Sequence, residues 1–531
     1  MWRPRENLRW MLLALLALCV GCASGASPVT ESTVTSGRLG AGQSGCDDSD
    51  RATPVNLERK LEVGWALQPG DIVSNSQFDV EALNQKHSVG SPGPQLMCGR
   101  LIAVIVSPPP VDDGSSLYQL LGDRKLVAID PASGRVLWKS ALPRGAQCES
   151  GPVGREIVCA VNPAEVNRSY CGYAAVVDAS KMPPCRGDVA PDVEQGDGLF
   201  LHYYNLDDGE SRVEHRGDLD DLAAAGNSAV TAAWEPLRDL DGQILVTRED
   251  AGDGSIAWTT RVPVNRADQP DWAIDNEAAR ILPLSDGFIQ VFGGDNESFV
   301  VAVDSGNIVA DVPNTGGAHR ARSMPGERVA VIREHGIDIY NRSGEVITHH
   351  PGESYLDLTV NPPADDGSQS YVLDGLASSP LPRYQFFDVE SGQKLPPLPT
   401  AMPGFPGAPA PGPGTTFGRV SLVKSISGHE ITGLTTHYVA AVDTFTGQVL
   451  WTHPGDDIGA PVSAVAIDGT IGLFTEPHST NVGRSAVVRA IDIRTGKVLW
   501  SMDELAALVP IGGQVLGVSA DQISSFTAPS S

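Results

Sequence analysis

An eleven-residue phrase that occurs three times constrains the fold more than any other feature of this chain. It reads AIDPASGRVLW at residues 128–138, AVDTFTGQVLW at 441–451 and AIDIRTGKVLW at 490–500. Alanine, aspartate, glycine and tryptophan keep their offsets in all three copies. Because a chain of 531 residues exceeds the usual size of a single domain, the repeat indicates a modular array of similar units.

Each copy of the phrase predicts a β-hairpin. In the first copy, one alternating segment ends at Asp130 and a second begins after Gly134. The aspartate can accept hydrogen bonds from the backbone N–H groups that follow it, and the glycine can adopt the left-handed conformation of the turn. Ala128 leaves room beside the turn, whereas Trp138 supplies a large apolar surface. Because a lone hairpin cannot bury an indole, we expect the tryptophan to pack between neighbouring units.

Looser copies of the hairpin fill the chain between the complete ones. The successive turn glycines are Gly134, Gly209, Gly254, Gly306, Gly344, Gly392, Gly447 and Gly496. Most intervals are about 40 to 55 residues, the length of a four-stranded unit with its loops. The residues expected to make the contacts between units are Ala128, Asp130, Gly134, Trp138, Asp250, Gly254, Trp258, Ala441, Asp443, Gly447, Trp451, Ala490, Asp492, Gly496 and Trp500.

This period predicts an all-β fold, a β-propeller whose blades surround a channel and expose only short edges. The C-terminal segment GGQVLGVSADQISSFTAP has the inner strands of a further unit but lacks the ending with glycine and tryptophan. The segment RKLEVGWAL around Trp65 has the pattern of the missing outermost strand. We therefore expect N- and C-terminal strands to close the ring within one shared blade.

The phrase A-x-D-x-x-[ST]-G-x-x-x-W closely resembles the tryptophan-docking motif of the PQQ-like β-propeller repeat. With its looser copies, the resemblance covers roughly residues 56–531. It implies about eight four-stranded blades. The turn glycines together with the shared closing blade would give one blade more, so we expect one weak copy, at Gly344 or Gly209, not to form a blade of its own.

Two groups of proteins share this repeat: the quinoprotein dehydrogenases, and the non-enzymatic BamB-like envelope lipoproteins that act as scaffolds in outer-membrane protein assembly. The dehydrogenases usually have an adjacent cysteine pair and a calcium site, and this sequence has no Cys-Cys dipeptide. Asp239 and Asp241 before Gly242 lack the ligand spacing of a calcium loop. His349 and His350 would face opposite sides of a strand, and we interpret them as exposed loop residues. We therefore predict no catalytic residue, no metal site and no cofactor.

The N-terminal residues have the pattern of an export signal. Arginines precede a short apolar run that ends near Cys22, and the run is too short to span a bilayer as a mature helix. A small residue followed by cysteine resembles the end of a bacterial lipoprotein signal. We expect a signal peptide at 1–21, a lipidated Cys22 and a flexible tether at 22–55, with free secretion as the alternative.

The remaining cysteines are disulfide candidates in an exported protein. They are Cys46, Cys98, Cys148, Cys159, Cys171 and Cys185. Sequence leaves their pairing open, and the simplest hypothesis pairs neighbours: Cys148 with Cys159, Cys171 with Cys185, and Cys46 with Cys98. Zinc is the competing interpretation, although no CxxC pair is present. The long interval between Gly134 and Gly209 predicts a cysteine-containing insertion at about 145–190.

The acidic composition excludes one class of partner. Because the formal net charge is -27 at pH 7, phosphate backbones repel the chain and nucleic acid is not expected. The proline-rich residues 396–414 are interpreted as an inter-blade loop or as a segment that docks in another protein. We predict a non-enzymatic envelope lipoprotein, membrane-anchored through its lipid, that binds other envelope proteins or polymers. The alternatives are a PQQ- and calcium-dependent dehydrogenase or other enzyme with its site at the channel, and a carbohydrate-binding module.

Overall fold

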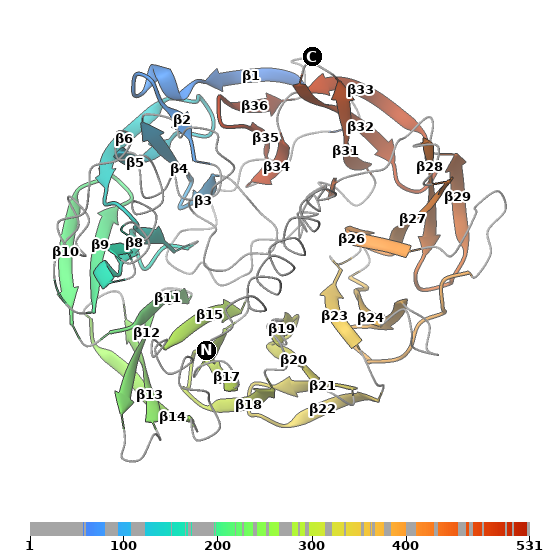
Figure 1. Cartoon of the computed structure of the whole chain (residues 1–531). Helices are drawn as coiled ribbons and strands as arrows, with labels where there is room; N and C mark the ends of the chain where they lie inside the picture. The colour runs from blue at the N-terminus through green and yellow to red at the C-terminus, as the bar shows by residue number, and fades with distance from the viewer. Residues whose placement is uncertain are drawn as a thin grey trace, which may run out of the picture.

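The computed structural model is a ring of antiparallel β-sheets arranged as the blades of a propeller (Figure 1). It describes most residues from Leu57 to Thr527. The longest segments outside the described residues are 1–56, 80–93, 108–122, 172–195, 265–278, 400–409 and 455–462, and shorter loops lie outside as well. The predicted signal peptide, Cys22 and the tether are therefore outside the described residues.

Within the described residues the strands form nine sheets, which we number as blades 1 to 9 along the chain. Blade 1 contains β2 (Gln77–Phe78), β3 (Gln95–Met97), β4 (Arg100–Ser107), β5 (Asp123–Ile129) and β6 (Val136–Leu142). Blade 2 contains β7 (Gln147–Cys148), β8 (Glu156–Val161), β9 (Leu199–Asn205) and β10 (Ser211–Arg216). Blade 3 contains β11 (Asp221–Ala225), β12 (Ser228–Pro236), β13 (Gly242–Asp250) and β14 (Ile256–Val264).

The middle of the chain forms three further blades. Blade 4 contains β15 (Arg280–Leu284), β16 (Phe288–Phe292), β17 (Glu297–Ala302) and β18 (Ile308–Pro313). Blade 5 contains β19 (Ala321–Met324), β20 (Arg328–Arg333), β21 (Gly336–Asn341) and β22 (Val346–Pro351). Blade 6 contains β23 (Tyr355–Val360), β24 (Ser370–Gly375) and β25 (Tyr384–Asp388).

The last blades return to the start of the ring. Blade 7 contains β26 (Ala410–Phe417), β27 (Val420–His429), β28 (Leu434–Asp443) and β29 (Val449–Pro454). Blade 8 contains β30 (Ser463–Ala466), β31 (Ile471–Thr480), β32 (Gly483–Asp492) and β33 (Val498–Glu504). Blade 9 contains β34 (Ala507–Ile511), β35 (Gln514–Val518), β36 (Ile523–Thr527) and, as its outermost strand, β1 (Glu62–Leu67).

The all-β propeller expected from the repeat is confirmed, but the ring has nine blades rather than about eight. Both weak copies form blades: Gly209 lies in the β9–β10 turn and Gly344 in the β21–β22 turn. The estimate was low because it followed the blade number that the resemblance implies, whereas the turn glycines together with the shared closing blade give nine. A polar turn with a glycine at positive φ is enough to form the hairpin without the indole.

The N- and C-terminal strands close the ring, as the sequence predicted. Strand β1 pairs antiparallel with β36, with Val63 opposite Phe526 and Leu67 opposite Ile523. Next to this junction, Leu57 and Leu61 are buried in the core that blades 8 and 9 share. Residues far apart in the sequence thus hold the first and last parts of the ring together.

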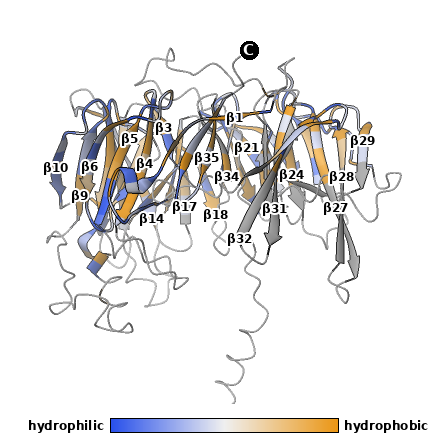
Figure 2. Cartoon of the chain, turned by 90° about the horizontal axis from the view of Figure 1, so that it is seen from above, coloured by the Kyte–Doolittle hydropathy of each residue, from blue (hydrophilic) through white to orange (hydrophobic). Residues whose placement is uncertain are grey.

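Apolar residues of the inner strands form the cores between neighbouring blades. Strand β4 buries six consecutive residues, from Leu101 to Val106, because each of its faces meets a neighbouring sheet. Strand β10 is outermost in its sheet and has no buried residue. Figure 2 shows this contrast as orange for β4 and blue for β10. The short 3-10 helix η2 (Pro69–Asp71) follows β1, and among the described residues no helix is long and apolar enough to cross a membrane.

The hairpin turn follows the chemistry of its sequence. In blade 1, the carboxylate of Asp130 accepts hydrogen bonds from Ala132 N–H at 3.0 Å and from the Ser133 hydroxyl at 2.7 Å. These contacts lower the pKa of Asp130, the hydroxyl of Ser133 having the largest effect. Gly134 has φ +71° and donates its N–H to the Asp130 carbonyl at 2.8 Å. The turn therefore requires a residue that tolerates positive φ at this position.

A disulfide bond joins Cys148 to Cys159, which lie directly opposite each other on β7 and β8. Cys98 and Cys171 are also disulfide-bonded, whereas Cys46 and Cys185 lie outside the described residues. The segment predicted as an insertion contributes β7 and β8 to blade 2. Most of the connection from β8 to β9 lies outside the described residues.

Candidate functional site: the blade junctions and the outer rim

Five tryptophans on outermost strands connect their blade to the next one. Each indole N–H donates a hydrogen bond to a backbone carbonyl across the junction. The pairs are Trp65 with Pro131 (2.8 Å), Trp138 with Leu206 (2.9 Å), Trp258 with Val303 (2.7 Å), Trp451 with Ile493 (2.7 Å) and Trp500 with Leu57 (2.7 Å). The accepting residue in the first four pairs lies in or beside the hairpin turn of the next blade. These contacts repeat the same geometry around much of the ring.

A glycine lies beneath the indole at most of these junctions. A Cβ atom added to Gly209 would come within 2.6 Å of the Trp138 ring, and one added to Gly134 within 2.6 Å of Trp65. On the strand beside the tryptophan, Ala128 lies opposite Trp138 and is fully buried. The glycine and the alanine of the phrase therefore leave the space that the indole fills.

The remaining junctions use other chemistry. Between blades 6 and 7, Pro396 lies beside Gly447, where an indole would otherwise be. Between blades 4 and 5, Arg342 forms an ion pair with Asp304 at 3.1 Å. Between blades 2 and 3, Arg216 forms an ion pair with Glu249 at 2.9 Å. Because these junctions contain no tryptophan, the repeated phrase of the sequence does not predict them.

His349 and His350 are not loop residues, contrary to the sequence interpretation; both lie on β22. They do face opposite sides of the strand. His349 is exposed, whereas His350 is buried between blades 5 and 6, where its Nε2 and the Tyr371 hydroxyl form a hydrogen bond of 2.5 Å. The ring of Phe387 lies 4.2 Å from that of His350. Burial, followed by the charge of His349, lowers the pKa of His350 to about 4, so this imidazole is neutral at pH 7.

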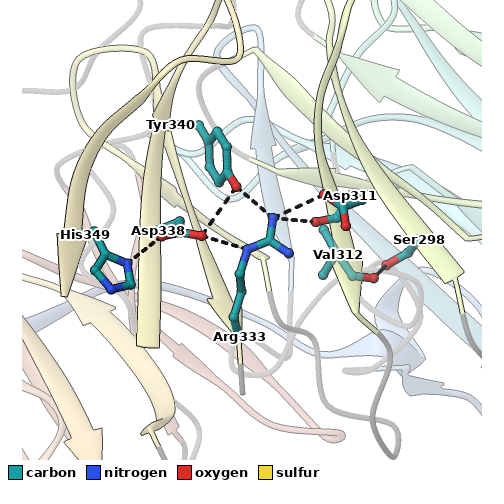
Figure 3. Close-up of polar contacts among 7 residues, drawn as sticks. All are labelled: Ser298, Asp311, Val312, Arg333, Asp338, Tyr340 and His349. Atoms are coloured by element: carbon teal, nitrogen blue, oxygen red, sulfur yellow. Dashed lines mark hydrogen bonds and ion pairs between the residues drawn. The ribbon is translucent and has the colours of Figure 1, made fainter. Parts of the chain in front are cut away.

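A polar cluster bridges blades 4 and 5 close to His349 (Figure 3). Arg333 Nε donates to Asp338 at 2.7 Å, and its Nη2 donates to the Tyr340 hydroxyl at 2.7 Å and to the Asp311 carboxylate at 3.2 Å. Asp338 also contacts His349 Nδ1 at 2.7 Å. Burial alone would lower the pKa of Arg333, but the hydrogen bonds to Tyr340 and Asp311 and their charges outweigh it and raise the pKa. The cluster is therefore a charged connection that leaves the Asp311 carboxylate and the His349 ring exposed to a polar partner.

Exposed aliphatic side chains gather on the outermost strands, and we call this set the outer rim. It consists of Val63 (57% exposed), Leu137 (37%), Val213 (54%), Ile256 (65%), Ile308 (41%), Val346 (46%) and Ile347 (44%). These residues belong to β1, β6, β10, β14, β18 and β22, each at the edge of its sheet. An edge strand with apolar side chains and unpaired backbone groups is a site for contact with another chain.

The residues weighed as metal ligands do not form a site that can be described. Asp239 and Asp241 lie outside the described residues, while Gly242 begins β13 and packs against Trp234. Among the described residues, no group of three or more His, Cys, Asp or Glu side chains is arranged to hold a metal ion.

No family model and no curated protein matches this chain. Among solved structures, the chain is similar to BamB from Moraxella catarrhalis, with 15% identity and a TM-score of 0.31 over 63% of this chain and 92% of that one. It is similar to a quinohemoprotein alcohol dehydrogenase from Comamonas testosteroni, with 9% identity and a TM-score of 0.37 over 91% and 80%. It is also similar to a eukaryotic initiation factor, with 12% identity and a TM-score of 0.39 over 76% and 87%. Both groups named from the sequence are represented, and the similarity is one of fold alone.

Proposed function

We propose that this protein is a non-enzymatic lipoprotein of the cell envelope whose propeller is a scaffold for other envelope proteins or polymers. The observation that carries the proposal is the outer rim, which places exposed aliphatic side chains on sheet edges in six consecutive blades, from β1 to β22. Single exposed aliphatic residues are ordinary on a protein surface. Their repeated position on edge strands favours contact with extended segments of partner chains.

The ring itself suits such a role. A closed propeller presents its edges at fixed positions, because each blade is held by both neighbours through buried cores. A rigid surface loses little conformational entropy when a partner binds. The N-terminal signal and Cys22 would place this surface on the extracytoplasmic side of a membrane.

Photocrosslinking in the native envelope tests the scaffold. A crosslinking residue at Ile347 or Val63 is expected to give protein adducts of defined mass, identified by mass spectrometry. The matched control is Asp208, an exposed polar residue of the β9–β10 turn that does not belong to the rim set. Adducts at the rim and not at Asp208 would support the proposal. If neither rim position gave adducts and the purified protein oxidised an alcohol in the presence of PQQ and calcium, the dehydrogenase alternative would replace the scaffold.

The membrane anchor has a separate test. Cys22→Ser is expected to move the protein from the membrane fraction to the soluble envelope fraction and to abolish its labelling by radioactive palmitate. Cys46→Ser is the matched control and should leave both unchanged. Membrane association that persists in Cys22→Ser without labelling of the natural protein would refute the lipid anchor while leaving the scaffold untouched.

A further inference from the structure

A proline-rich segment lies at the outer edge of blade 6, where the other blades have a fourth strand. Among the described residues blade 6 contains three strands, whereas every other blade contains four or five. Residues 394–399, KLPPLP, follow the turn after β25, and we call them the strap. Lys394 forms a single bridge with Phe387, and the Leu395 N–H donates to the Phe386 carbonyl at 2.9 Å. The two residues that follow are prolines, which have no N–H and cannot continue the ladder.

The sequence of the strap imposes an extended conformation. Proline fixes its own φ at about −65°, and the residue before a proline is restricted to the extended region. Leu395, Pro396 and Leu398 each precede a proline, so steric restriction favours a polyproline II helix with three residues per turn. Leu395 and Leu398, which are three residues apart, are half-buried, whereas Pro396 and Pro397 between them are exposed. The leucines therefore face the ring, and the proline pair faces solvent.

Contacts with two blades hold the strap in place. In blade 6, the Leu395 carbonyl accepts a hydrogen bond from Gln385 Nε2 at 2.9 Å. In blade 7, Leu398 packs against a buried apolar cluster of β27 and β28. Pro396 lies between these anchors, beside the turn glycine Gly447. Because the strap is already ordered, it would lose little conformational entropy on binding a partner.

We propose that the exposed pair Pro396 and Pro397 docks in an aromatic-lined groove of a partner protein. Grooves of this kind recognise polyproline II segments by packing aromatic rings against proline rings. The contact differs from that of the outer rim, where an edge strand can add a partner strand through its backbone. The strap offers no N–H at two successive positions, so its recognition depends on the rings. The inference rests on the proposed scaffold function and specifies one contact within it.

The charges of the chain favour a different protein as the occupant. The proline pair is uncharged, so an aromatic groove can cover it without desolvating a charge. A second copy of this chain is a poor occupant because both copies carry a net charge of -27 and repel each other.

The first test uses an isolated WW domain as the probe, because its aromatic groove binds extended proline segments. Fluorescence anisotropy of the fluorescein-labelled domain is expected to rise on addition of the full-length protein. Pro397→Ala is expected to weaken this binding by about fivefold or more. The matched control is Pro351→Ala, which replaces an exposed proline at the end of β22 and should leave binding unchanged. Urea denaturation shows that both variants are folded.

The second test uses photocrosslinking in the native envelope. A crosslinking residue at Lys394, which is exposed beside the proline pair, is expected to give a protein adduct. The peptide QKLPPLPT, residues 393–400, should suppress the adduct, whereas QKLAALPT should not.

Failure of the WW domain to bind would overturn the proposal, as would binding that Pro397→Ala leaves unchanged. An adduct at Lys394 that the proline peptide does not suppress would also overturn it, because the contact would then be independent of the rings. Adducts at Val63 or Ile347 with none at Lys394 would leave the scaffold standing and refute the strap contact. Absence of protein adducts at all three positions would refute the scaffold itself.

Discussion

Blade 2 meets its two neighbours through different chemistry. Toward blade 1, Trp138 is only 8% exposed and donates to Leu206 across the junction. Toward blade 3, Arg216 pairs with Glu249, and the buried Glu149 carboxylate accepts the Ala224 N–H at 3.0 Å. Both neighbours keep their places in the ring. The comparison teaches that stacked sheets set the position of a blade, whereas the indole adds stability and closes the turn to solvent.

The largest expected effect is loss of the indole at the junction of blades 1 and 2. Trp138→Ala removes a buried aromatic ring and its hydrogen bond, and we expect unfolding to become easier by about 4 kcal/mol. Urea denaturation followed by circular dichroism measures this. Pro396→Ala at the junction of blades 6 and 7 provides the contrast, since the exposed proline should cost less than about 1 kcal/mol. Equal losses in the two variants would contradict the role given to the indole.

A pair of glycine variants separates backbone strain from contact with the indole. Gly209 and Gly254 have φ of +73° and +68°, so alanine at either position is strained by about 1 kcal/mol. At Gly209 the new methyl group would also collide with Trp138, which brings the expected loss to about 3 kcal/mol. The difference between the urea midpoints of the two variants measures how much stability the contact of the new methyl group with Trp138 costs. Equal losses in the two variants would contradict the close contact between the Gly209 position and the Trp138 ring.

The fold was predictable because its signal lies in local hairpin chemistry. Asp130, Gly134 and Trp138 each act within a few residues of the turn or at the next junction, and their spacing survives in the sequence. The number of blades was harder to predict, since the hairpins at Gly209 and Gly344 form without a tryptophan. A polar turn with glycine is common in loops, so such a copy is weak evidence on sequence alone.

The candidate site was much less predictable, because it depends on register and on neighbours. Sequence alignment assigns Val213 to the position of the indole in blade 2, but the continuous β9–β10 register puts Arg212 there. The same applies to His349 and His350, whose opposite environments arise from the blades that flank β22.

The junction between blades 5 and 6, where His350 contacts Tyr371, is expected to make the stability of the fold depend on pH. Burial lowers the pKa of His350 to about 4, below the value of about 6.5 in the unfolded chain. Between these values the unfolded state binds more protons, so the contribution of His350 to stability is fully present above pH of about 6.5 and is lost as the pH falls toward about 4. We expect this loss to be on the order of 2 kcal/mol. Urea denaturation at several pH values in this range measures the loss. The free energy of unfolding of His350→Gln should depend less steeply on pH than that of the natural protein. An equally steep dependence in the variant would exclude His350 as its source.

The smallest effect concerns the ion pair between blades 2 and 3. The hydrogen bond to Glu249 has the largest effect on the pKa of Arg216 and raises it further above its usual value, and both side chains are less than a quarter exposed. A double-mutant cycle with Arg216→Ala and Glu249→Ala should give a coupling of about 1 kcal/mol that shrinks in high salt because ions screen partly exposed charges. Arg212 and Glu214 are 3.7 Å apart and more exposed, and their cycle is the control with coupling near zero. If the Arg216 cycle also gave no coupling, the polar link between blades 2 and 3 would rest on contacts such as that between the Glu149 carboxylate and the Ala224 N–H, and the ion pair would have no part in the contrast with the indole junction.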